Sequence, residues 1–238
     1  MSTLGGSTEG TGWVVALPAE AHSLGIRGVG IGGCARWRDG WIAVSGIGPH
    51  NAMRAAERLL ACGVARLANW GVAGALDATL AAGDVLIVDR IRYARGDPGF
   101  ATDAETSQRL AATLASALRV RRGTLWSTAQ PVATLPEKQA LAERTGAVAV
   151  DMEAAPVAAV ALRAKLPFVA VKAICDPAGR ELPAGIVRAL DGADEGWSPR
   201  MVAAIAFGGP ATWRATYALT RDFRRARRSL ATAAALAA

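Results

Sequence analysis

The order of secondary-structure patterns along the chain constrains its fold more than any other feature. Short β-rich runs alternate with Ala/Leu/Arg-rich segments of helical period over most of the 238 residues. Strands are expected at 13–17, 41–47, 66–72, 84–91, 123–128, 147–151 and 167–174. Helices are expected at 50–62, 104–118, 136–145, 153–165, 199–207 and 212–229. Repeated strand-then-helix units predict an α/β fold with a parallel or mixed sheet covered on both faces.

The length of the chain fits one full-sized core better than two small domains. Residues 1–11 lack the basic and apolar regions of a signal peptide and are expected to form a flexible leader. Residues 12–238 are expected to form one domain that ends in a basic helix. No apolar run reaches the roughly 20 residues that span a bilayer. We therefore expect a cytoplasmic protein, with the inner face of the membrane as a further location.

The cysteines and histidines exclude several kinds of site. Cys34, Cys62 and Cys175 are widely spaced, and the only histidines are His22 and His50. This pattern argues against a disulfide framework and against a metal site. Cys175 is also a poor candidate for a nucleophile, because no histidine lies near it in the sequence to activate it. A buried, structural Cys175 is expected.

The chain is basic, with 27 Lys and Arg against 20 Asp and Glu. Much of the excess lies in "RDFRRARRSL" (221–230) near the C-terminus. A solvated helix end explains this run most simply, and contact with an anionic membrane surface is the alternative. Nucleic acid is the least favoured partner, because no aromatic residues are interleaved for base stacking.

Acids in an apolar run identify the first candidate site residues. The stretch "VDMEAAPVAAVA" (150–161) contains Asp151 and Glu153 among apolar residues. Glu153 is expected at a strand-to-helix junction, aimed into a cleft. Pro156 then falls in the first helical turn, where its missing N–H costs little. Asp151 is expected to be a structural or capping acid.

Two further acids follow strands at the same edge of the expected sheet. Asp176 comes just after the strand at 167–174, where open α/β sheets gather ligand groups. In a dry cleft its pKa would be raised and it could donate a proton, whereas the alternative is a turn before Pro177. Glu20 follows the first strand, and the alternative for it is stabilisation of a helix N-terminus.

Two glycine-rich stretches differ in their context. "GVGIGG" (28–33) fits a dinucleotide-binding pattern in its letters, but it leads toward a strand instead of a helix. We expect a turn there. "NWGVAGAL" (69–76) ends a strand, and its glycines allow a ligand to approach the backbone. A tight bend explains this second stretch equally well.

These segments, in this order, resemble the purine nucleoside phosphorylase / methylthioadenosine–adenosylhomocysteine nucleosidase superfamily. The resemblance covers about residues 12–180 and rests on "ALPAE", "SGIG", "GVAG" followed by "GDVLIVD", "VDMEAAPVAAVA" and "VKAICDPAG". It implies a three-layer α/β/α fold around a mixed sheet. It also implies cleavage of the N-glycosidic bond of a purine nucleoside.

The resemblance implies a role for each matching residue. Asp176 matches the acid that protonates the leaving purine, and Glu20 matches the acid that orients the attacking water in nucleosidases. The remaining matches are substrate-binding positions: Glu153 at the ribose hydroxyls, Met152 against the sugar, Pro131 and Val132 at the adenine edge, and Gly71, Val72, Ala73 and Gly74 in the glycine-rich loop.

Departures from the family pattern bear on the nucleophile. Phosphorylases often carry Arg where this chain has Asn69, and Ser or Thr where it has Val72. Arg54 is an alternative residue for holding phosphate, but nothing in the sequence supports that role. Water is therefore expected as the nucleophile, with inorganic phosphate as the alternative co-substrate. No other cofactor is expected.

The subfamily suggested by the resemblance is that of the hopanoid-associated phosphorylases, which release adenine from adenosylhopane. Its support is the short N-terminus, "LPAE", Val72 and the basic tail. Alternatives are a methylthioadenosine/adenosylhomocysteine nucleosidase, a purine nucleoside phosphorylase, and a nucleoside- or lipid-binding module without activity. Relatives imply a homo-oligomer, with a dimer favoured, whose ligand is a small nucleoside.

Overall fold

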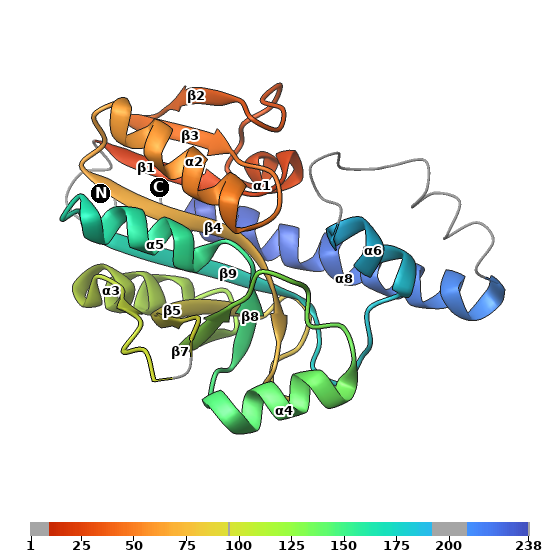
Figure 1. The fold of residues 1–238 in the computed structure, drawn as a ribbon. Helices are drawn as coiled ribbons and strands as arrows, with labels where there is room; N and C mark the ends of the chain where they lie inside the picture. The colour runs from red at the N-terminus through yellow and green to blue at the C-terminus, as the bar shows by residue number, and fades with distance from the viewer. Residues whose placement is uncertain (1–9, 95, 192–208, 238) are drawn as a thin grey trace.

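One mixed sheet of nine strands organises the protein (Figure 1). The computed structural model describes residues 10–94, 96–191 and 209–237. The strands are β1 (Thr11–Val15), β2 (Cys34–Trp37), β3 (Gly40–Val44), β4 (Arg66–Ala75), β5 (Val85–Arg92), β6 (Phe100–Ala101), β7 (Val120–Ser127), β8 (Ala149–Asp151) and β9 (Phe168–Asp176). The helices are α1 (Pro18–Ser23), α2 (Pro49–Ala61), α3 (Ala104–Leu114), α4 (Leu135–Thr145), α5 (Ala154–Arg163), α6 (Ala184–Asp191) and α8 (Gly209–Leu236).

Strand β4 holds the sheet together because it pairs with three neighbours. It runs parallel to β1 and β9 and antiparallel to β8. Strand β9 also pairs with β5, β5 pairs with β7, and β7 pairs with β8. The pairings β4–β9–β5–β7–β8–β4 therefore close a ring within the sheet. The register between β4 and β9 shifts between Ala73 and Gly74, next to the end of β9.

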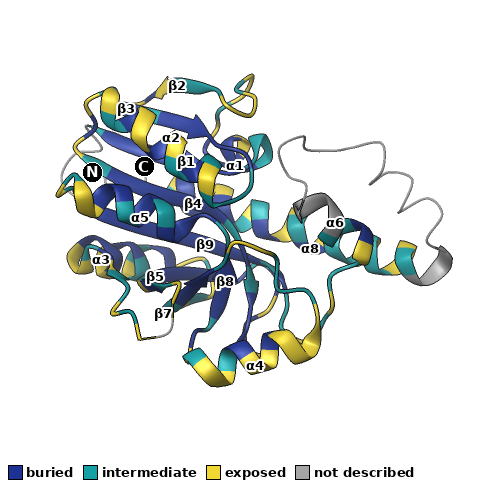
Figure 2. Ribbon diagram, viewed as in Figure 1, coloured by how far each residue is buried: buried dark blue, intermediate teal, exposed yellow. Residues whose placement is uncertain are grey.

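Helices cover both faces of this sheet, which confirms the predicted three-layer α/β/α architecture. Apolar residues of α2 and α5 form one core cluster with the strands, represented by Leu59 and Val157. Residues of α1, α3 and α8 form a second cluster on the other face, represented by Leu110 and Leu230. Figure 2 shows the strands almost entirely buried between these helices, whose outer sides are exposed.

The seven expected strands are all present, with ends shifted by up to three residues. Two strands were missed. β2 is a short strand at the edge of the sheet that follows the "GVGIGG" turn, and β6 has only two residues. The "GVGIGG" segment forms a turn and leads into β2, as expected.

Several helix predictions need correction. Helix α6 lies in the Gly/Pro-punctuated segment that follows β9, where no helix was expected. Helix α3 ends at Leu114 because residues 115–118 turn away, and α8 extends to Leu236, well past the expected end at 229. The expected helix at 199–207 lies outside the described residues. Strand β1 begins at Thr11, so the expected leader 1–11 overlaps it by one residue.

Within the described ranges, no helix combines the length and apolar character needed to cross a bilayer.

Candidate active site

The three predicted site acids are buried and lie at, or shortly after, the carboxyl ends of strands. Glu20 follows β1 in α1, Glu153 links β8 to α5, and Asp176 is the last residue of β9. Their exposed fractions are 2%, 7% and 5%. Since few carboxylates are buried without partners, the contacts of each define what it can do.

Glu20 is held by backbone amides on two elements. Its Oε2 accepts hydrogen bonds from the N–H groups of Ala16 and Leu17, at 2.8 and 2.9 Å. Its Oε1 accepts from the N–H of Val72 on β4, at 2.9 Å. Burial raises the pKa of Glu20, although nearby Lys172 and these amides oppose the shift. The residue thus caps the N-terminus of α1, as the alternative interpretation expected, and also contacts the glycine-rich strand.

Glu153 lies in a cluster of charges between β8, β9 and α2. Its Oε1 accepts a hydrogen bond from the N–H of Gly48 at the start of α2, at 2.8 Å. Burial and repulsion by Asp151 raise the pKa of Glu153 to about 7, while Lys172 and the Gly48 amide oppose this shift. Glu20 adds to the repulsion, so the structure brings Glu20 and Glu153 into electrostatic contact.

Asp151 and Lys172 form a buried ion pair beneath this cluster. Lys172 Nζ lies 2.7 Å from Asp151 Oδ2, and the same oxygen accepts from the N–H of Ala154 at 3.0 Å. Burial alone would lower the pKa of Lys172, but Asp151, Glu153 and Glu20 outweigh burial and raise it. Asp151 caps α5, which confirms the prediction that it is a structural acid, and Lys172 neutralises part of the acidic cluster.

Asp176, at the end of β9, is paired with a different lysine, Lys138. Its Oδ2 is 2.6 Å from Nζ of Lys138, while its Oδ1 is buried with no hydrogen-bond partner among the described residues. Burial raises the pKa of Asp176, and Lys138 and Arg180 only partly oppose it. An acid whose pKa is raised and which has one oxygen without a partner can donate a proton to a ligand.

The glycines of β4 allow the acids to approach the backbone. A Cβ on Gly71 would lie 2.5 Å from Glu20 Oε1, and a Cβ on Gly74 would lie 3.3 Å from Asp176 Oδ2. Between them, the side chain of Ala73 packs in the core, so any contact of Ala73 with substrate would come from its backbone. The segment 71–74 therefore connects the Glu20 side of the site to the Asp176 side.

We expect Gly71→Ala to destabilise the protein and displace Glu20. The added methyl would overlap a carboxylate that three backbone amides hold in place, which costs about 1–3 kcal/mol of unfolding free energy. Gly74→Ala is the matched control, since its contact requires a shift of only a few tenths of an ångström. Chemical denaturation measures both variants, and equal stability of the two would contradict this account.

The residues predicted at the adenine edge lie in a surface hollow of their own. Pro131 and Val132 line a pocket of about 530 Å³ together with Trp126, Leu141 and Arg144. None of the three predicted acids lines it. Met152 is half-buried beside Glu153 in the chain, and no contact tests its predicted place against the sugar.

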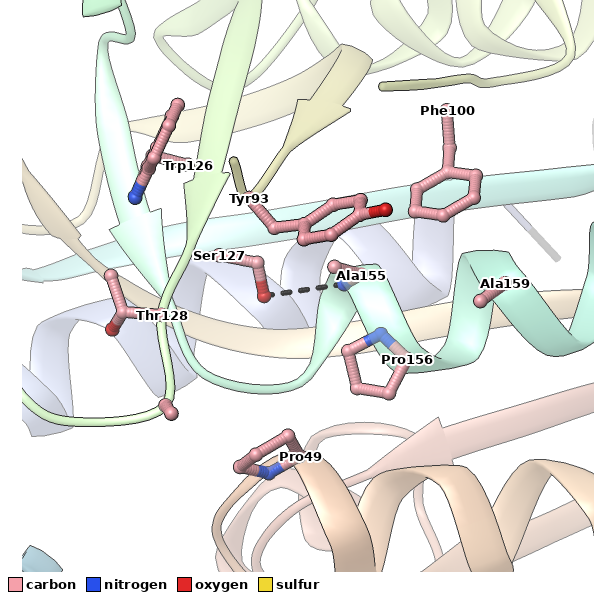
Figure 3. A pocket seen from close by; sticks show the side chains of 10 residues that line it. Pro49, Tyr93, Phe100, Trp126, Ser127, Thr128, Ala155, Pro156 and Ala159 are labelled. Carbon is pink, nitrogen blue, oxygen red and sulfur yellow. Dashed lines mark hydrogen bonds between the residues drawn. The ribbon is translucent and has the colours of Figure 1, made fainter. Parts of the chain in front are cut away.

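A second hollow, of about 550 Å³, adjoins the start of α5 (Figure 3). Tyr93 and Phe100 stack with their ring centres 5.6 Å apart, and they line it with Pro49 and Pro156. At its floor the N–H of Ala155 donates to Ser127 Oγ at 3.2 Å, which is the dashed line in Figure 3. Pro156 lies in the first turn of α5, as predicted.

Sequence reasoning missed two lysines and a backbone amide that contact the acids of the candidate site. Lys138 lies on a helix with mostly exposed residues, and Lys172 lies within β9, where its single charge in an apolar run was the available signal. The Gly48 amide could not be found from side-chain patterns. Burial raises the pKa of the Cys175 thiol, so this residue stays protonated and is no nucleophile. In the described part of the chain, no group of His, Cys, Asp and Glu forms a metal site.

A mixed sheet between two helical layers, with buried acids at its strand ends, defines the class of α/β phosphorylase- and hydrolase-like proteins. The family model of the phosphorylase superfamily matches residues 39–206. The chain belongs to this superfamily, and it is an enzyme of the nucleoside phosphorylase and nucleosidase type.

Solved structures share the fold at low sequence identity. The 5′-methylthioadenosine/S-adenosylhomocysteine nucleosidase of Neisseria meningitidis, in complex with methylthio-immucillin-A, is 20% identical with a TM-score of 0.71, and the match covers 95% of this chain and 97% of that one. The futalosine hydrolase of Helicobacter pylori is 18% identical with a TM-score of 0.69, covering 96% and 97%. A Helicobacter pylori nucleosidase variant with 5′-methylthioadenosine in its active site is 22% identical with a TM-score of 0.64, covering 78% and 93%.

Proposed function

We propose that this enzyme hydrolyses the N-glycosidic bond of an adenine nucleoside that carries a 5′ substituent. The observation that carries the proposal is the buried Asp176, whose Oδ1 is unoccupied and whose pKa is raised. A neutral carboxyl group at this position supplies the proton that a leaving purine needs at N7. Binding alone would not require a proton donor.

The second cluster of acids supports the same reaction. Loss of the base leaves positive charge on the ribosyl group, and nearby carboxylates stabilise that charge. Glu153 would grip the ribose hydroxyls, and Glu20 would orient the attacking water. Lys172 limits the mutual repulsion of these acids, so that they can remain close together in a buried site.

The surroundings of Asn69 favour water over phosphate as the nucleophile. Asn69 takes the position where phosphorylases often carry Arg, and its Nδ2 donates to the carbonyl of Val14 at 3.3 Å. Arg54 lies exposed on α2. A phosphate dianion is held best by Arg and hydroxyl donors, and the neighbouring Val72 offers only its backbone.

The similar solved proteins suggest the first substrates to test. Two of them are nucleosidases of 5′-methylthioadenosine and S-adenosylhomocysteine, and the third hydrolyses futalosine. Methylthioadenosine and adenosylhomocysteine are therefore the leading candidates.

The proposal is tested by incubating the enzyme with methylthioadenosine, adenosylhomocysteine, adenosylhopane and inosine, each with and without phosphate. Free base and the sugar product are measured. We expect adenine and a free ribosyl product without phosphate. Release of base only with phosphate, as a sugar 1-phosphate, would make the enzyme a phosphorylase, and adenine binding without any release would favour the binding module.

Adenosylhopane is the second candidate substrate, because one face of α8 suits a membrane surface. Exposed Trp213, Tyr217, Arg221, Arg224 and Arg228 follow one another at helical spacing and form the arginine–aromatic face. The opposite side of α8 buries Ala226, Leu230 and Ala233 against the sheet. Arginines with interfacial aromatic residues bind anionic lipid, where a nucleoside with a lipid 5′ substituent would reside.

The membrane proposal predicts salt-sensitive binding to anionic vesicles. Arg224→Gln with Arg228→Gln should weaken binding to phosphatidylglycerol-containing vesicles roughly 30-fold, at about 1 kcal/mol for each arginine. Arg54→Gln with Arg163→Gln removes the same charge from the α2–α5 face and serves as the control. Equal vesicle binding by both double variants in cosedimentation would exclude the arginine–aromatic face.

The homodimer implied by the resemblance also remains a proposal. The mass of the chain in solution, measured by light scattering, tests it directly.

A further inference from the structure

Lys138 is an unusual residue for the helix that carries it. Helix α4 lies at the margin of the sheet, and its only buried residues are Lys138 and Leu141 (Figure 1). Lys138 is 1% exposed, whereas lysines are rarely buried because removal of an ammonium group from water costs several kcal/mol. Full pairing of its ammonium group is therefore expected.

The ammonium group of Lys138 contacts three acceptors after the end of β9. Nζ lies 2.6 Å from Asp176 Oδ2, 3.2 Å from the carbonyl of Pro177 and 2.6 Å from the carbonyl of Arg180. An ammonium group has three N–H donors, so these contacts use all of them. One side chain of α4 thus fixes both the Asp176 carboxyl and the loop that follows it.

This arrangement makes the two oxygens of Asp176 unequal. Oδ2 accepts from Lys138 and also faces the backbone of Gly74, where even a methyl group would lie 3.3 Å away. Oδ1 is buried and has no hydrogen-bond partner among the described residues. A proton on Oδ2 is disfavoured, because that oxygen already accepts a hydrogen bond from the ammonium group of Lys138.

We propose that Lys138 is a positioning residue, which occupies Asp176 Oδ2 and so leaves Oδ1 as the oxygen that delivers the proton. This inference rests on the proposed function and adds to it a residue that does not touch the substrate. Lys138 also makes Asp176 a stronger acid than burial alone would, since the ammonium group stabilises the carboxylate that remains after proton transfer.

Other charges around Asp176 act in the same region. Arg180 follows Asp176 in the loop and pairs with Asp222, a buried residue of α8 that Arg221 also contacts at 3.0 Å. Arg180 lowers and Asp222 raises the pKa of Asp176, and Lys138 has the larger effect. Lys138 is the one of these four groups in direct contact with the Asp176 carboxyl.

The test compares Lys138→Met, Lys138→Arg and the control Lys165→Met, which removes an exposed lysine after α5. We expect Lys138→Met to lower kcat for adenine release on the order of 10²-fold, because the acid loses its orientation. The descending limb of its pH profile should move to higher pH, since Asp176 then holds its proton longer. Lys138→Arg retains the positive charge, so the descending limb of its pH profile should stay at the pH seen in the unaltered enzyme.

A structural role alone gives a different result. It predicts that Lys138→Met yields less folded protein, and that the folded part shows the same pH profile as the unaltered enzyme. That outcome would overturn the proposal. In an Asp176→Asn background, Lys138→Met should cause little additional loss of kcat, because the lysine acts through Asp176. Full additivity of the two losses would also overturn it.

A measurement without substrate separates this inference from the proposed function. Carboxyl-carbon NMR of labelled aspartate follows the titration of Asp176 in the unaltered enzyme and in Lys138→Arg and Lys138→Met. Loss of the charge should raise the titration midpoint of Asp176, whereas an unchanged midpoint would refute the role of Lys138. If the midpoint rises and no nucleoside is cleaved, the proposed function fails and the contact with Asp176 stands.

Discussion

Asp176→Asn should reduce the rate of adenine release by about 10²–10⁴-fold, the usual contribution of a general acid. Asparagine keeps the size of the side chain and can still accept a hydrogen bond from Lys138, but its amide cannot give up a proton to N7. The loss should therefore appear in kcat, with adenine binding largely retained. Single-turnover release of adenine, followed at several pH values, measures the effect.

Asp89→Asn is the control for the loss of one carboxylate. Asp89 lies on β5 in a half-exposed pair with Arg122, away from the predicted site. Its variant should retain full activity. If Asp176→Asn is folded by circular dichroism and turns over at a near-normal rate, Asp176 is not the proton donor.

Glu153→Gln should have the second largest effect and should also change the pH profile. In the proposed reaction Glu153, as a carboxylate, would accept from the ribose hydroxyls and face the developing positive charge, so its loss should lower kcat/KM on the order of 10²-fold. Its pKa of about 7 means that the active, ionised form becomes populated as the pH rises through that value. The unaltered enzyme should therefore gain activity across pH 6–8 along a limb centred at about 7.

In Glu153→Gln this ascending limb should be absent, because glutamine does not titrate. Glu143→Gln, on the exposed side of α4, is the control and should keep the limb. The pH dependence of kcat/KM distinguishes the two. A limb near pH 7 that persists without Glu153 would assign the ionisation to another group.

The same ionisation affects stability, with a defined sign. The pKa of Glu153 is raised from its ordinary value of 4.5 to about 7 in the folded protein, so folding favours the protonated form. Its favourable contribution is complete below pH 4.5 and is lost as the pH rises to about 7. Glu153→Gln, which mimics the protonated form, should gain stability relative to the unaltered protein at pH 8 and less at pH 5.

The sequence was sufficient for the architecture because the buried strands are apolar runs separated by helical segments. What it did not predict are elements with weak local signals. β2 has only four residues, one of them Arg36, so it lacks a clear apolar run. β6 has two residues and is too short to show an alternation of apolar and polar residues. α6 contains a glycine and follows Pro183, so its composition resembles a loop, although its residues form a helix after that proline.

The site was predictable to the extent that carboxylates are conspicuous in apolar runs. Glu20, Glu153 and Asp176 stood out for that reason, and the structure buries all three, with Asp176 at the end of β9, Glu153 at the start of α5 and Glu20 in α1. Their cations did not stand out. Lys138 sits among glutamate, glutamine and arginine in α4, where a lysine normally faces solvent. Only the approach of α4 to the end of β9, a tertiary contact, gives this residue its partner.

The closed ring of strands has a consequence for how the enzyme loses activity. Gly71, Gly74 and Asp176 lie on β4 and β9, two members of the ring, so neither strand can detach without breaking pairings on both of its sides. Amide hydrogens of these strands should exchange with deuterium only through the largest opening of the molecule. During denaturation, catalysis and the slowest-exchanging amides should therefore disappear in the same transition, while the exposed turns of α4 exchange long before it.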